Sequence, residues 1–445
     1  MAMTDFTIIR RSMTSRMFST VTTIVTVAVA VTLMLTLLSM RDSGRRAFER
    51  GTGNMHMLIS RDASPLVSVL NGIFYADPPA RPIDQAKLEE LGDAFPASFF
   101  IPTQQGDSYL GLPVLATVPE FFTRFSPDPN FNPDARPDEP NGSPWVFAEG
   151  RAFERSFEVV FGARAARETS IQLGDRIVLT HGTDVSRKAA DRADLFEPHV
   201  HEEYEYEVVG ILEPTGSAHD RAVFSDLTSS WIIHAHDRRK LEDPDVAATT
   251  EADLIPADRL VTGIYGRVAT RPGSNVSAVI PSVLSGLRTD PTITVAQPKE
   301  EIDSLFNIVS NIDQILIAMA AAVLVSSGIA IMLALYNSME QRKRQVAVLR
   351  VLGCSRGRVF GLVLTESAVI GLLGGAAGVL GALIGSQTVA GALRARIGLV
   401  VDPVFEPRLM LAIVLGTVLL AALAGLVPSV LAYRTPVAKN LRPIG

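Results

Sequence analysis

Four long apolar stretches constrain this chain more than any other feature of its sequence. They cover residues 18–40, 315–336, 360–393 and 409–433, and Glu366 is the only acidic or basic residue within them. Each stretch exceeds the roughly 20 residues with which an α-helix crosses a bilayer. Because lipid offers the backbone no hydrogen-bond partners, each is expected to be a helix. The sequence therefore predicts a membrane protein with four transmembrane helices.

The first stretch also resembles a secretory signal, because three arginines precede it. A signal peptide has an apolar region of about 7–15 residues followed by small residues at a cleavage site. Here the apolar region is longer and is followed by Met40-Arg41-Asp42. We therefore expect a retained membrane anchor, with a cleaved signal peptide as the alternative.

Basic residues mark one side of the membrane. The N-terminal tail carries three, the 337–360 loop carries six against the single acid Glu340, and the C-terminal tail carries three. Short loops rich in Lys and Arg stay in the cytoplasm. We therefore expect both termini and this loop to be cytoplasmic, and residues 41–310 to lie outside.

The charge distribution agrees with this division. Residues 41–310 carry 26 basic and 41 acidic side chains, and the rest of the chain carries 15 and 6. An acidic domain argues against a nucleic-acid partner, which requires a basic face. The single cysteine, Cys354, leaves this domain without disulfides, and its size allows a sufficient core without them. We predict an α-helical membrane protein with four transmembrane helices and a large α+β extracytoplasmic domain inserted between helices 1 and 2.

Three segments illustrate the expected α+β character. A strand is predicted in residues 203–212, because glutamates alternate with Tyr204, Tyr206 and Val208 in its first part, which indicates one wet face and one buried face. The apolar spacing in residues 153–169 predicts a helix, and residues 230–233 are expected to form a short strand.

The 337–360 loop contains the most informative motif, Glu340-Gln-Arg-Lys-Arg-Gln-Val-Ala-Val-Leu-Arg-Val-Leu-Gly-Cys-Ser-Arg356. Its apolar residues can share one helix face with basic residues beside them, and Gly353 can end the helix. This pattern predicts an amphipathic helix at the membrane surface. Such a helix either rests on anionic membrane lipids or docks a cytoplasmic partner. The apolar stripe consists of Met339, Val346, Leu349 and Leu352.

This motif, the following Leu364-Thr-Glu-Ser367 and the glycine-rich stretch resemble the FtsX domain of MacB/FtsX/LolC-type ABC transporter permeases. The outer domain resembles a MacB-type periplasmic core domain in Leu173-Gly-Asp-Arg-Ile-Val-Leu179 and Tyr206-Glu-Val-Val-Gly-Ile-Leu212. The resemblance implies a protein of the bacterial inner membrane with a periplasmic domain. The implied domains are 1–40 (cytoplasmic tail and transmembrane helix 1), 41–310 (periplasmic domain) and 311–445 (permease domain).

The resemblance further implies a permease subunit whose ATP and Mg²⁺ bind to a separate cytoplasmic ABC ATPase. The sequence agrees, because it has no Gly-Lys pair and so no Walker A loop. We identify no catalytic residues and expect no cofactor for catalysis in this chain. Two permease copies, most simply a homodimer, would pair with two ATPases, and a periplasmic adaptor or lipoprotein could join them. The residues expected to couple to the ATPase are Glu340, Arg342, Arg344, Val346, Leu349, Arg350, Leu352 and Gly353.

By the same resemblance, ATP hydrolysis would drive movements of the periplasmic domain, a mechanism called mechanotransmission. The expected role is export, extraction or efflux of a lipoprotein, lipid, peptide or small amphiphile. One alternative is a transmembrane signalling scaffold that regulates cell-wall hydrolases, although this domain is larger than such a regulator needs. Another is a membrane-tethered metal-binding chaperone, which is compatible with transport.

The third apolar stretch contains residues that suit helix packing. Gly371 and Gly375, like Gly374 and Gly378, are four residues apart, which lets helix backbones approach closely. This pattern fits packing within one subunit or a face between two copies. Glu366 is expected to face protein or water, or to reach the membrane interface.

Six of the seven histidines lie between residues 181 and 236 and include two His-x-His pairs. On a strand, side chains i and i+2 share a face, so each pair could bind one metal ion. Imidazole suits zinc, copper and nickel. The hypothesis is a site for zinc or another transition metal, and a solvated His-rich loop is the alternative. The candidate ligands are His199, His201, His219, His234 and His236.

Overall fold

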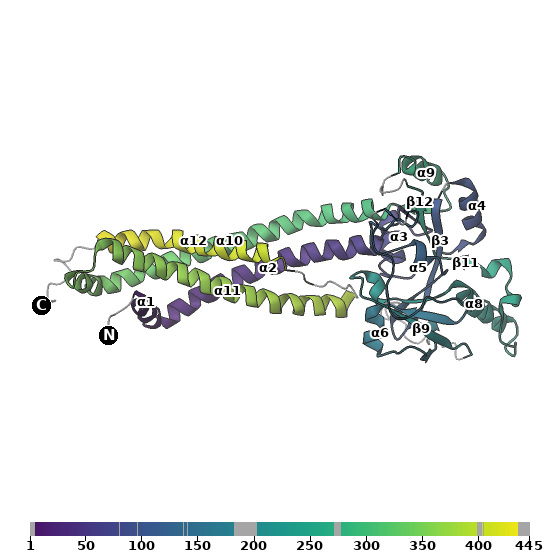
Figure 1. Ribbon diagram of the computed structural model, residues 1–445, viewed down its shortest axis with the longest axis horizontal. Helices are drawn as coiled ribbons and strands as arrows, with labels where there is room; N and C mark the ends of the chain where they lie inside the picture. The colour runs from purple at the N-terminus through teal and green to yellow at the C-terminus, as the bar shows by residue number, and fades with distance from the viewer. Residues whose placement is uncertain are drawn as a thin grey trace. The chain divides into compact units, whose positions relative to one another are not determined.

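The chain divides into two compact units, which we describe separately. The membrane unit comprises Met1–Gly44 and Ile308–Gly445, and the sheet unit comprises Arg45–Asn307. The computed structural model, shown in Figure 1, describes residues 5–79, 81–95, 97–136, 138–139, 141–181, 203–270, 277–397, 403 and 405–434.

Among the residues that the structure describes, four helices are long and apolar enough to cross a membrane. Each has a buried side, and one buried cluster combines Val31, Leu335, Ile370 and Ala421, one residue from each helix. Their other sides expose apolar residues such as Leu415, which suits contact with lipid tails. The prediction of four apolar helices is confirmed. They are α2 (Met17–Thr52), α10 (Pro298–Val351), α11 (Arg356–Ile397) and α12 (Pro407–Arg434), and a short helix α1 (Asp5–Thr14) precedes them.

The course of α10 corrects the prediction of a separate surface helix in the 337–360 loop. The helix continues from its apolar part, Gln314–Asn337, to Val351. Residues 338–351 contain neither proline nor glycine, so nothing in the sequence interrupts the helical hydrogen bonds. The helix ends where Gly353 adopts a left-handed φ of +94°. The expectation that Gly353 terminates this helix is therefore confirmed.

The sheet unit is built on a mixed sheet that has 11 strands among the described residues. Its order is β13-β1-β12-β3-β4-β10-β6-β9-β5, with β7 paired to β9 and β8 paired to β3. The pairs β4–β10 and β6–β9 are parallel. The strands are β1 (Met57–Ser60), β2 (Ile83–Asp84), β3 (Ala97–Tyr109), β4 (Leu112–Thr117), β5 (Phe147–Gly150), β6 (Glu158–Phe161), β7 (Arg176–Ile177), β8 (Thr180–His181), β9 (Tyr206–Leu212), β10 (Val223–Asp226), β11 (Leu260–Val261), β12 (Gly263–Val268) and β13 (Thr294–Ala296), of which β2 and β11 form a separate pair.

Both faces of the sheet are covered. Alternate residues of β1 enter different buried clusters, Leu58 with Phe121 in one and Ile59 with Trp231 in the other. A strand whose neighbouring side chains are all buried must have protein on both sides. The helices of the sheet unit are α3 (Pro65–Gly72), α4 (Ala86–Ala94), α5 (Phe121–Arg124), α6 (Ala163–Thr169), α8 (Leu227–Glu242) and α9 (Ile280–Leu287), with short 3₁₀ turns η1 (Ala218–Arg221), η2 (Glu251–Asp253) and η3 (Pro256–Asp258).

The strand predicted in residues 203–212 is confirmed as β9, in which Tyr206 and Val208 are buried and Glu207 is exposed. The helix predicted over 153–169 is wrong in its first half. There, β6 inserts between β9 and β10, because pairing on both edges favours its β-branched residues in a strand.

The strand predicted at residues 230–233 is wrong, because this segment belongs to α8. The Asp226 side chain accepts a hydrogen bond from the Ser229 N–H and so caps the start of the helix. The 16 residues of α8 contain no proline or glycine that would end it earlier. The helix carries both His234 and His236, which removes the strand geometry that the metal hypothesis assumed for this pair.

Candidate functional site

The corner between α10 and α11 is packed on one side. Met339 and Val346 of α10 are buried together with Val359 and Val363 of α11 and Ala432 of α12. Two members of the predicted apolar stripe thus face protein. Their contacts join the ends of three helices into one packed corner.

The other side of this corner exposes apolar side chains. Leu352 is 77% exposed and Val351 is 64% exposed, and Val348 is exposed as well. Arg350, which lies between Val348 and Val351 in the sequence, is half-buried. Of the other residues expected to couple to the ATPase, the side chains of Glu340, Arg342, Arg344 and Leu349 lie outside the described part of the structure. Exposed apolar residues at a helix end are suited to contact another protein.

Glu366 of α11 faces protein within the membrane unit. Its Oε1 accepts a hydrogen bond of 2.6 Å from Ser12 Oγ and lies 2.5 Å from Arg16 Nη2. Ser12 belongs to α1, and Arg16 lies in the turn that leads into α2. A paired charge is far less costly in a membrane protein than an isolated one. The pair links the N-terminal segment to α11. The helix α1 was not predicted from the sequence, although its residues Ile9 and Ser12 are buried one turn apart.

The glycines of α11 allow two other helices of the same chain to approach closely. A Cβ atom on Gly371 would lie 2.6 Å from the Ala421 side chain of α12. On Gly374 and Gly378 it would lie 2.6 Å from Val27 and 2.5 Å from Val31, both in α2. The contact of Gly375 with Val414 of α12, at 3.4 Å, is looser. These glycines therefore pack within one subunit.

His219 is a core residue of the sheet unit. Its Nε2 donates to the Gly51 carbonyl oxygen at 3.0 Å, and its Nδ1 lies 2.7 Å from the Tyr75 hydroxyl. Because a carbonyl only accepts, the neutral ring carries its proton on Nε2 and accepts from Tyr75 at Nδ1. Burial lowers the pKa of His219 to about 4. Metal binding at either nitrogen of His219 would displace the partner that this nitrogen now has in the core, Tyr75 or Gly51.

Of the remaining predicted metal ligands, the structure describes His234 and His236. His236 of α8 is buried, and its Nδ1 lies 3.0 Å from Thr249 Oγ1. Burial lowers the pKa of His236, and nearby Lys240 lowers it further. His199 and His201 lie outside the described residues.

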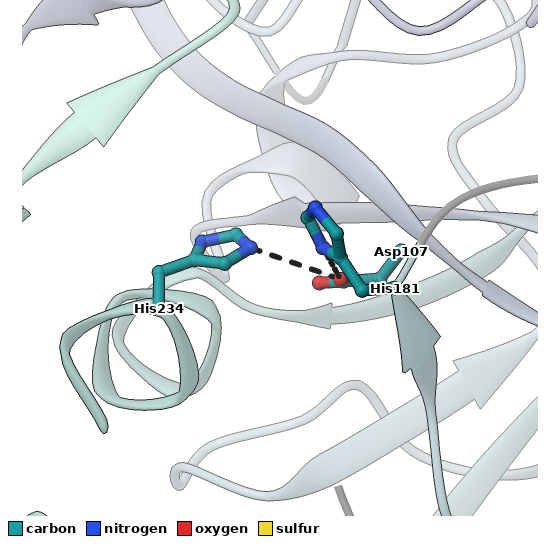
Figure 2. A group of neighbouring side chains, drawn as sticks. All are labelled: Asp107, His181 and His234. Carbon is teal, nitrogen blue, oxygen red and sulfur yellow. Dashed lines mark hydrogen bonds and ion pairs between the residues drawn. The ribbon is translucent and has the colours of Figure 1, made fainter. Parts of the chain in front are cut away.

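His234 instead lies beside two residues that the sequence hypothesis did not include, Asp107 and His181 (Figure 2). Asp107 Oδ1 lies 3.1 Å from His181 Nδ1 and 3.7 Å from His234 Nε2. Asp107 comes from β3, His181 from β8 and His234 from α8. His181 belongs to the histidine-rich region of the sequence, but no local pattern marks Asp107. The pairing of β3 with β8 places Asp107 opposite His181.

The electrostatics of this group reflect its close packing. Burial alone would raise the pKa of the Asp107 carboxyl, but the neighbouring imidazoles of His181 and His234 outweigh it and hold the pKa well below its usual range. The Asp107 carboxylate in turn raises the pKa of His181. The group thus presents a carboxylate with two imidazoles around it.

A cavity of about 420 Å³ lies elsewhere in the sheet unit. It combines the apolar Trp145 and Val146 with the charged Arg46, Glu49 and Arg50. Its volume is in the range of pockets that hold small molecules. A mixed lining of this kind suits an amphiphilic guest.

Four apolar helices and an α+β domain define a polytopic membrane protein with a large sheet-containing domain. Comparison with known families identifies both parts. The model of the MacB-like periplasmic core domain matches residues 20–284, and that of the FtsX-like permease C-terminal domain matches residues 317–437. A search of curated protein sequences gave no significant match. The chain belongs to the family of FtsX-like ABC transporter permeases with a MacB-like periplasmic core domain.

Proposed function

We propose that this chain is the permease subunit of an ABC transporter and transmits ATP-driven movement into its periplasmic domain. Permeases of this family work with a cytoplasmic ABC ATPase. The chain would form a homodimer with two ATPase subunits, with both termini in the cytoplasm and the sheet unit in the periplasm. The sheet unit is then the domain inserted between the first and second membrane helices.

The exposed apolar corner after α10 carries this proposal. Residues 338–351 extend α10 beyond its apolar part by about 20 Å of helix rise. At the end of this extension, Val351 and Leu352 are exposed while Met339 and Val346 pack inward. Such a corner offers an ATPase an apolar contact that is attached firmly to three helices.

The course of two helices supports transmission of the movement. Both α2 and α10 contain residues of the membrane unit and of the sheet unit. A continuous helix carries displacement along its axis because its backbone hydrogen bonds are intact. ATPase closure at the cytoplasmic corner would therefore move the sheet unit, which would act on a lipoprotein, lipid, peptide or small amphiphile. The cavity beside Trp145 is a candidate place for part of such a cargo.

The test is a charged substitution at the corner. We expect Leu352→Asp to reduce co-purification of the ATPase and permease-stimulated ATP hydrolysis in nanodiscs at least tenfold, because it places a charge in an apolar contact. Leu110→Asp is the matched control, since Leu110 is 74% exposed in the turn after β3 and Asp tolerates its positive φ.

If Leu352→Asp bound and stimulated the ATPase like the unmodified chain, the proposed contact would be wrong. If the intact complex hydrolysed ATP without moving any cargo and activated a cell-wall hydrolase, the signalling scaffold would replace the transporter.

A further inference from the structure

We propose that Asp107, His181 and His234 form a binding site for a divalent transition metal ion, with zinc as the best match. One donor atom from each residue lies within 4.8 Å of the other two. In Figure 2 both imidazole rings face the Asp107 carboxylate. This site differs from the His-x-His pairs of the sequence hypothesis and shares only His234 with them.

The distances between the donor atoms suit a metal ion if the His234 side chain moves slightly toward Asp107. Tetrahedral zinc with bonds of about 2.0–2.1 Å places its ligand atoms about 3.3 Å apart. Asp107 Oδ1 already lies 3.1 Å from His181 Nδ1 and 3.7 Å from His234 Nε2. The two rings are nearly perpendicular, with an interplanar angle of 84°, so their nitrogens approach the carboxylate from different directions.

An unsatisfied nitrogen provides independent support. His234 Nε2 is buried and has no hydrogen-bond partner among the described residues, although it points toward Asp107. A buried polar atom without a partner is costly, and an ion at this position would satisfy it. The donor set, two imidazoles and one carboxylate, also matches a common arrangement in zinc sites.

Gln104 is placed to orient one of the ligands. Its side-chain amide lies 2.9 Å from His234 Nδ1, and its Oε1 is buried without a partner among the described residues. A histidine that binds metal through Nε2 carries its proton on Nδ1 and donates it to a neighbouring acceptor. Rotation of the amide would present Oε1 to that proton. Gln104 is therefore a positioning residue for His234.

The fold explains what such an ion would do. The three ligands come from β3, β8 and α8, so the ion would fasten α8 to the sheet at this point. The side chain of His181 is 52% exposed, which leaves an approach for water or a donor atom from another molecule as the fourth ligand. The site does not depend on the proposed coupling to an ATPase.

The test is zinc binding by the full-length protein in detergent, without an affinity tag and with Cys354→Ser, because a thiolate also binds zinc. Protein stripped with EDTA is titrated with Zn²⁺ against a chromophoric chelator, and Co²⁺ is used to record the visible spectrum of the bound ion. We expect one zinc per chain. His181→Ala and Asp107→Asn are each expected to weaken binding at least tenfold, and Gln104→Leu about tenfold.

Because His181 is half-exposed, His181→Ala is the variant least expected to disturb folding. Circular dichroism verifies that each variant is folded. The matched control is the double variant His199→Ala/His201→Ala, which is expected to retain zinc affinity. The proposal is overturned if the Cys354→Ser protein with an intact site binds no zinc, or if folded His181→Ala in the same background binds it with unchanged affinity. Loss of binding in the control alone would move the site to the His199/His201 pair.

Discussion

His219 shows how the surroundings of a residue decide its role. In sequence it belongs to a histidine-rich region and has an acidic neighbour, Asp220. In the structure it is fully buried among aromatic rings that include Phe125 and Trp145. Both of its ring nitrogens are hydrogen-bonded, to Tyr75 and Gly51. Its neutral form is therefore part of the core.

This burial predicts loss of stability in acid. The pKa of His219 is about 4 in the folded chain and near 6.5 when unfolded, so the unfolded chain binds more protons between these values. The contribution of neutral His219 to the free energy of unfolding is complete above pH 6.5. It is lost as the pH falls toward 4, and the total loss is roughly 3 kcal/mol.

His219→Gln is expected to flatten the pH dependence of stability in this range. Both tryptophans, Trp145 and Trp231, lie in the sheet unit, so their fluorescence during thermal unfolding in detergent follows that unit alone. The melting temperatures of both proteins are compared at pH 7.5 and pH 5. Equal losses in the variant and the unmodified chain would show that His219 does not titrate as proposed.

At the scale of elements, α11 depends on the close approach of its neighbours. Gly378 contacts α2, where the Thr32 hydroxyl donates to the Gly378 carbonyl oxygen at 3.0 Å. Gly371 contacts α12 on another side of the same helix. Small residues in membrane helices allow such contacts, which replace the hydrophobic driving force that lipid removes.

Gly378→Ala is expected to destabilise the membrane unit, because its Cβ would lie 2.5 Å from Val31 Cβ. Overpacking of this kind costs about 1–3 kcal/mol. Gly416→Ala in α12 is the control, since beyond its own stretch of helix no described residue comes within 4 Å of the added Cβ. Thermal stability in detergent, followed by loss of monodisperse protein, should fall for the first variant only. Similar melting temperatures for the two variants would contradict this packing.

At the scale of the whole molecule, the charge division supports a proposed topology. The segment 41–310 is strongly acidic, and the remainder of the chain is basic. Basic loops are retained in the cytoplasm. Cys354, at the α10–α11 corner, should therefore lie inside, and the sheet unit should lie outside.

Cysteine labelling tests this topology directly. In spheroplasts, a membrane-impermeant maleimide is expected to label Leu241→Cys in a Cys354→Ser background, because Leu241 is 89% exposed in the sheet unit. Native Cys354 should react only after the membrane is permeabilised. Labelling of Cys354 in intact spheroplasts, with protection of Leu241→Cys, would show the opposite orientation and would contradict the proposed ATPase contact.

Several features were predictable because their determinants are local or depend on composition. Long apolar stretches are expected to be helices in lipid, and the four apolar helices follow from this alone. The alternation in β9 and the end of α10 just before Gly353 also follow from neighbouring residues. The motif after Glu340 and the two motifs of the outer domain pointed to the permease family that both family matches confirm.

Tertiary structure decided the features that join residues distant in sequence. The strand β6 formed where the first half of a helix was predicted, because two strands pair with it, and α8 formed where a strand was predicted at residues 230–233. Asp107 and His181 are 74 residues apart and meet only because β3 pairs with β8. Spacing along the chain determines which side chains share one element's face, whereas the packing of elements determines which faces meet.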